Sequence, residues 1–169
     1  MADLKWGDVR EDWVDDGGLP DVLVQDATSD DWDRVLDVVR DRGWPTKYSV
    51  DGDVASMPGN VSPIFEIRHD KSVRWEVRPH PDVAVNCHFF AIEEIGFDVS
   101  PREVVDEETF DAFCEFVTAI GRALGKPVDV TADGAPSDVF MRYEPAADRL
   151  VRVPPPPTIS LLDRLGGRS

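Results

Sequence analysis

Three residues that could do acid–base chemistry lie close together in the middle of the chain, where His88 is followed by Glu94 and Asp98. Histidine titrates near neutral pH, and carboxylates can orient it, bind a cation or exchange protons with a substrate. This set would suit a small hydrolase or a metal-dependent enzyme, which we keep as one alternative. Acids that directly follow a strand more often form a solvated loop, and we favour that interpretation, with no catalytic residue assigned.

The cysteines give no further support for catalysis. Cys87 precedes His88 in a predicted strand, and neighbouring strand side chains point to opposite faces, so the pair cannot easily bind one metal ion. Cys114 is too far away in the sequence to complete a zinc knuckle or a redox pair. The chain also has no glycine-rich phosphate loop and no nucleophile elbow. We therefore expect buried thiols, no metal and no cofactor.

The net charge of −16 is unusual for a chain of 169 residues. Aspartate supplies 24 of the 34 acids, and only four lysines are present. Such a surface repels nucleic acid and anionic membranes and attracts basic proteins. No run of 18 apolar residues and no signal-peptide core is found. These features predict a cytoplasmic protein with a basic protein partner, although high charge can also serve solubility alone.

The segment 83–92, which contains Cys87 and His88, is the longest strand-like run in the sequence. Bulky side chains fall on both of its faces near Phe89 and Phe90. That pattern is typical of a central strand covered on both sides, around which the other elements would be organised.

Two helices are predicted on either side of this strand. The first, over 30–42, follows a capping Thr28 and carries a buried stripe that begins with Trp32. The second, over 106–124, has its buried stripe at Phe110, Phe113, Cys114, Val117, Gly121 and Leu124. The spacing of Ser100, Pro101 and Glu103 also resembles a capping box that opens a helix. In the acidic segment 1–20, Trp6 and Trp13 should pin the chain to the domain.

The remaining strand candidates are 19–24, 47–50, 64–68, 73–78, 128–131 and 139–143. We predict one α+β domain over residues 1–150, with an antiparallel sheet of five to six strands and two main helices. Residues 151–169 form a proline-rich tail with a net charge of +2, from three arginines and one aspartate. Its apolar residues are typical of a docking peptide: Ile159, Leu161, Leu162 and Leu165.

Several short motifs resemble a small uncharacterised bacterial α+β family with an NCHFF…PRE…GKPV…RYEP pattern. The matching stretches here are 86–90, 94–98, 101–103, 125–128 and 142–145. The resemblance covers about 6–145, implies an α+β fold and a short cytoplasmic protein of immunity or accessory type, and supplies no catalytic residue.

The leading functional hypothesis is an acidic protein-binding module rather than an enzyme, such as an immunity protein that occludes a basic toxin. Partner contacts are expected from Glu93, Glu94, Asp98 and Arg102, together with the four apolar tail residues. An accessory subunit that docks through its tail is the other alternative.

Overall fold

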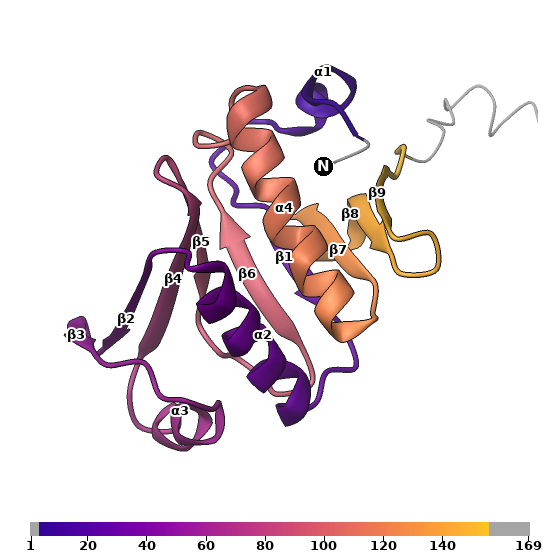
Figure 1. Ribbon diagram of the computed structural model, residues 1–169. Coiled ribbons are helices and arrows are strands. Elements are labelled where there is room, and N and C mark those ends of the chain that lie inside the picture. The colour runs from indigo at the N-terminus through magenta and orange to yellow at the C-terminus, as the bar shows by residue number, and fades with distance from the viewer. Residues whose placement is uncertain (1–3, 156–169) are drawn as a thin grey trace, which may run out of the picture.

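The computed structural model describes residues 4–155, which form one antiparallel sheet with helices packed on it (Figure 1). The strands are β1 (Asp21–Val24), β2 (Thr46–Val50), β3 (Asp53–Ala55), β4 (Val73–His80), β5 (Val83–Cys87), β6 (Ile95–Val99), β7 (Val128–Ala132), β8 (Ala135–Glu144) and β9 (Arg149–Arg152). The helices are α1 (Trp6–Val9), α2 (Ser29–Arg42), α3 (Ser62–Ile67) and α4 (Glu107–Leu124), with a 3-10 turn η1 (Arg10–Asp12). The predicted α+β class is confirmed. The predicted tail contacts Ile159, Leu161, Leu162 and Leu165 lie outside the described residues.

The sheet is larger than the predicted five to six strands, since it has nine strands within the described residues. Their order is β3-β2-β4-β5-β6-β1-β7-β8-β9. Three of them are not among the predicted strands: β3 is short and fully exposed, β6 lies where the acids favour a loop, and β9 spans the predicted start of the tail at residue 151. The segment 64–68 was predicted as a strand, which is wrong, because most of it belongs to α3.

The two predicted main helices are confirmed, and their caps explain where they begin and end. Thr28 and Asp31 form a reciprocal capping box at the start of α2, and Gly43 ends the helix in a left-handed conformation. Asp106 caps α4 in the same way, and Gly125 ends it. The helix predicted to open at Ser100 is instead a turn, and the side chain of Glu103 accepts a hydrogen bond from the N–H of Ala84 at 2.9 Å.

One face of the sheet is buried and the other is open. Helices α2 and α4 lie side by side on the same face (Figure 1). Alternate strand residues such as Val73, Trp75 and Val85 are buried beneath them. The prediction that the strand starting at Val83 is covered on both sides is therefore wrong, because the opposite face carries mainly polar side chains.

The segment before β1 packs against α4 through its tryptophans, as predicted. The ring of Trp6 lies 5.6 Å from Phe110, and Trp13 meets Phe113 edge-on at 5.0 Å. No helix within residues 4–155 combines the length and the apolar character needed to cross a membrane.

Candidate functional site

The open face of the sheet brings together the three residues with potential acid–base chemistry, since His88, Glu94 and Asp98 line one hollow. His88 follows the last residue of β5, and Asp98 lies in the neighbouring strand β6, so that His88 Nε2 is 3.4 Å from Asp98 Oδ2. The amide of Asn86 donates to the other oxygen of Asp98 at 3.4 Å. In turn, Asn86 Oδ1 accepts from the guanidinium of Arg74, at 2.8 Å from Nη2. The result is a polar chain across β4, β5 and β6.

Other carboxylates surround this pair. Asp21 on β1 is the direct cross-strand neighbour of Asp98. Burial raises the pKa of Asp21, and the negative charges of Asp133, Asp98 and Glu94 raise it further, against a lowering hydrogen bond from the Gly134 N–H. Glu94 lines the hollow with them, and its Oε2 accepts from Gln25 Nε2 at 2.6 Å. The hollow here measures about 150 Å³, and the residues that line it include no serine, cysteine or lysine that could act as a nucleophile.

The cysteine next to His88 belongs to the core. Cys87 is completely buried on the helix-covered face, and burial raises the pKa of its thiol. Cys87 and His88 thus lie in different environments. Among the described residues, no group of three or more His, Cys, Asp or Glu side chains is arranged to hold a metal ion.

The predicted strand 83–92 ends early, and the reason lies in the backbone of Phe89. Strand β5 stops at Cys87, and Phe89 has a φ of +54°. A left-handed conformation costs a residue with a side chain roughly 1–2 kcal/mol. Phe89 adopts it while its ring is buried against Trp32, at a centroid distance of 5.2 Å, and Phe65, at 5.9 Å. Strained backbone of this kind is found preferentially at functional sites.

The turn at Phe89 places the next residue on the surface. Phe90 is 78% exposed, the highest value among the exposed large apolar side chains of the described residues. Its ring stacks on that of His88 at 5.4 Å, and the Arg68 guanidinium carbon lies 5.6 Å from its centre. Arg68 also donates from Nε to the carbonyl of His88 at 3.3 Å. Phe90 is therefore an exposed aromatic ring held in place by its neighbours.

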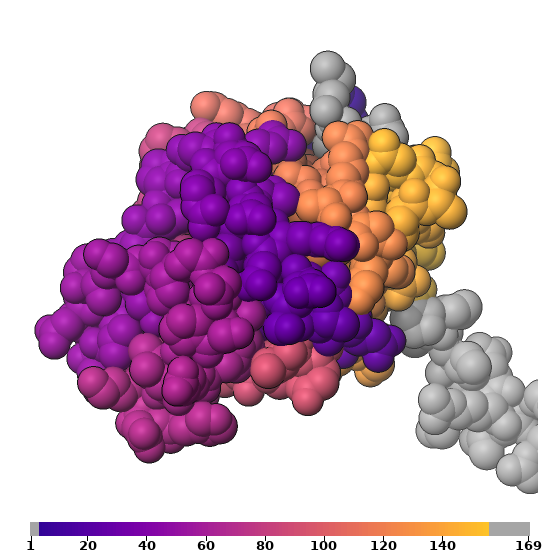
Figure 2. Space-filling view, turned by 60° about the horizontal axis from the view of Figure 1, so that its bottom comes forward, coloured from indigo at the N-terminus to yellow at the C-terminus, as the bar shows by residue number. Residues whose placement is uncertain are grey.

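The chain after Phe90 is fixed to the helix layer. Trp32 Nε1 donates to the carbonyl of Ile92 at 2.9 Å, and the N–H of Ala27 donates to the carbonyl of Glu93 at 2.8 Å. Ile92 remains 41% exposed, and a hollow of about 490 Å³ lies between this segment and α3. In Figure 2 the pink β5–β6 connection reaches the surface beside the magenta segment that holds α3.

We call this region, made of Phe65, Arg68, His88, Phe90, Ile92, Glu93 and Glu94, the Phe90 surface. Of the predicted partner contacts, Glu93 and Glu94 belong to it, and Asp98 borders it through His88. Arg102 does not, because it follows β6 at the opposite end of that strand, where its Nε pairs with Asp15 at 3.1 Å. Phe90 and Arg68 are not among the predicted contacts, although two adjacent bulky aromatic residues cannot both be buried in a sheet covered on one side.

Comparison of the chain with protein-family models, with curated proteins and with solved structures finds no match. The family resemblance of the short motifs therefore stays a prediction.

Proposed function

We propose that this protein is a binding module that captures a basic protein partner through the Phe90 surface and acts by occluding it. The observation that carries the proposal is the 78% exposure of Phe90 in a fixed position. Aromatic residues dominate the energetics of protein interfaces, and a ring that is already ordered loses little side-chain entropy on binding.

The charge of the chain supports a basic partner. The net charge of −16 attracts cations over long range, and the Phe90 surface adds Glu93 and Glu94 beside the aromatic ring. An apolar centre with a charged rim is the usual anatomy of a protein interface. Occlusion of a basic toxin by an immunity protein would be one form of this activity, in the cytoplasm.

A second candidate, a small hydrolase, is favoured by one observation, the 3.4 Å contact between His88 and Asp98. In a hydrolase, Asp98 would orient His88 as a general base. The hydrogen bond that holds Glu94 to Gln25, and the use of the His88 ring as a platform for Phe90, favour binding over catalysis.

Photo-crosslinking tests the proposal in the source cells. With p-benzoyl-phenylalanine in place of Phe90, we expect crosslinks to one basic protein, identified by mass spectrometry. The same label in place of Val54, which is 70% exposed on β3, serves as the matched control. With the purified partner, Phe90→Ala should weaken binding about 30-fold, as expected for an interface residue worth about 2 kcal/mol. Equal crosslinking at both positions, or an acidic partner, would contradict the proposal.

A further inference from the structure

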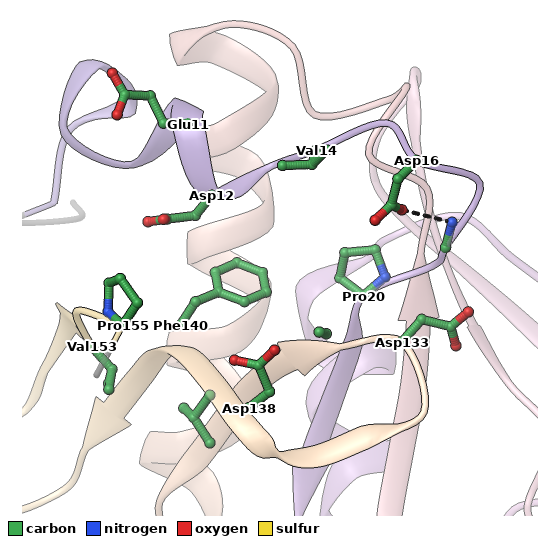
Figure 3. A pocket seen from close by; sticks show the side chains of 13 residues that line it. Glu11, Asp12, Val14, Asp16, Pro20, Asp133, Asp138, Phe140, Val153 and Pro155 are labelled. Atoms are coloured by element: carbon green, nitrogen blue, oxygen red, sulfur yellow. Dashed lines mark hydrogen bonds between the residues drawn. The ribbon is translucent and has the colours of Figure 1, made fainter. Parts of the chain in front are cut away.

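A second concave region lies towards the β9 edge of the sheet, between the segment that contains η1 and the β7–β8 hairpin (Figure 3). We call it the acidic groove; its volume is about 550 Å³. Its carboxylates are Glu11, Asp12, Asp16, Asp133 and Asp138, and its apolar lining includes Val14, Pro20, Val139, Phe140, Val153 and Pro155. Figure 3 shows the acids of the first segment on one side and those of the hairpin on the other, with Phe140 between them.

One carboxylate of the acidic groove, Asp12, is already paired with a basic side chain from the end of the described chain. Arg152 of β9 donates to Asp12 through two nitrogens, Nε at 2.8 Å and Nη2 at 3.2 Å. Arg152 does not itself line the groove, whose described lining includes no lysine and no arginine, so the other carboxylates have no basic partner there. Carboxylates on both sides of a concave surface repel each other and favour a cationic occupant.

The chain is directed along this groove where the described residues end. Strand β9 runs antiparallel to β8, and Met141 pairs with Arg152. One further hydrogen bond, from the N–H of Val153 to the carbonyl of Phe140 at 2.9 Å, continues the pairing, and Pro155 lines the groove. The next positions of β8 in this direction, 135–139, lie beyond the reach of β9 and form an edge available to an extended peptide.

We propose that residues 156–169 dock into the acidic groove of the same molecule. This segment contains Arg164 and Arg168 against one acid, Asp163, so its charge is opposite to that of the groove. Its apolar residues, Ile159, Leu161, Leu162 and Leu165, match the apolar lining. This proposal does not depend on the Phe90 surface. It places the tail in a groove of its own chain rather than on another molecule.

Reach and tethering favour docking within one molecule. The 14 residues of the segment span about 40 Å when extended at ~3.1 Å per residue, so both arginines can return to the groove from Pro155. A short tether holds a binding segment at an effective concentration in the millimolar range. This effective concentration exceeds the concentration of other copies of the protein in an ordinary solution, so docking within one molecule is favoured over docking between molecules.

Paramagnetic relaxation in the full-length protein tests the proposal. A nitroxide reagent should label Ser160→Cys selectively and leave the four apolar side chains in place, because the native Cys87 and Cys114 are buried. We expect loss of amide signal intensity at Val14, Asp133 and Val139, and none at Asp53 on the distant strand β3. The loss should be reversed by Asp133→Asn with Asp138→Asn, or by ~0.5 M salt, which shortens the Debye length to about 4 Å.

Charge variants and mixed samples complete the test. Arg164→Gln with Arg168→Gln should restore the signal, whereas Arg149→Gln, at an exposed position of β9, should not. If the nitroxide-labelled protein without any charge substitution keeps full signal intensity at the groove amides, the proposal is overturned. In a mixed sample, one population carries the nitroxide and the other carries the isotope label. An equal signal loss in that sample would also overturn the proposal, because the segment would then dock between molecules.

Discussion

The ring of Tyr143 on β8 fills the space that a side chain at position 121 of α4 would need. A Cβ atom built on Gly121 would overlap with ring carbons of Tyr143, which is itself buried. Gly121 therefore allows α4 to approach the sheet closely. Glycine in a helix interior is otherwise unfavourable by about 1 kcal/mol relative to alanine.

Gly121→Ala should consequently destabilise the protein in spite of its better helix propensity. Forcing atoms into a packed core costs typically about 1–3 kcal/mol. Urea denaturation should show this decrease in the free energy of unfolding. Gly7→Ala in α1, where an added Cβ meets no atom within 4 Å, is the control and should change stability by less than about 0.5 kcal/mol. A Gly121→Ala variant as stable as the wild type would show that helix and strand can separate freely.

Two phenylalanines should respond in opposite ways to truncation. Phe113 is completely buried in α4 and packs on Trp13, so Phe113→Ala should lower the free energy of unfolding by about 3–5 kcal/mol. Phe90→Ala removes an exposed ring and should change it by less than about 0.5 kcal/mol. Thermal unfolding of the two variants measures the contrast. A large loss for Phe90→Ala would make that ring a structural element rather than a binding contact.

Acid should weaken the attachment between α2 and the segment after α4. Burial favours the protonated form of Asp31, yet its hydrogen bond with Lys126, at 2.6 Å, and that from the Thr28 N–H hold the pKa of Asp31 below its ordinary value. A lowered folded-state pKa means that the stabilisation is fully present above the unfolded pKa of about 3.9 and is lost as the pH falls through the lower folded value.

Asp31→Asn should therefore lower the free energy of unfolding at pH 7 by about 1–2 kcal/mol and reduce its decline below pH ~4. Asp37→Asn on the same helix, where the carboxylate pairs with Arg40 in solvent, is the matched control. Urea titrations between pH 7 and pH 3 give both quantities. If the two variants have the same acid profile, the pair of Asp31 with Lys126 contributes nothing to stability.

Association with the partner identified by crosslinking should depend on salt. Long-range attraction to a chain of net charge −16 accelerates encounter at low ionic strength. Stopped-flow measurement should show an association rate constant that falls steeply as salt rises through the physiological range. Phe90→Ala should raise the dissociation rate constant and leave the salt dependence of association unchanged. A rate constant that is independent of salt would contradict electrostatic attraction.

The helices could be predicted because their signals are local. Thr28, Gly43 and Gly125 mark the ends of α2 and α4 within a few residues, and the apolar spacing fixes the buried faces. The prediction of a strand around Ile64 is wrong because a short apolar run has no clear period, and only burial of Val61 with Ile64 reveals a helical turn.

The site depended on information that the sequence carries only indirectly. His88 and Asp98 meet because β5 and β6 pair with Asn86 opposite Asp98, a register set by the whole sheet. The position of Phe90 depended on the left-handed backbone of Phe89, which residue type does not indicate. The alternation of Ile95, Phe97 and Val99 was a readable strand signal, and its use would have placed Asp98 on the open face.

The strand order also has a consequence for synthesis of the protein. Strand β1 lies between β6 and β7, so Val22 pairs with Phe97 on one side and with Val130 on the other. The strands β2–β6 can pair in turn as they leave the ribosome, but β1 has no neighbour until residues 95–99 have followed, and its second edge stays open until β7 emerges. A newly made β1 is thus an unpaired apolar strand until β6 has emerged, a stage at which chaperones act on exposed edges.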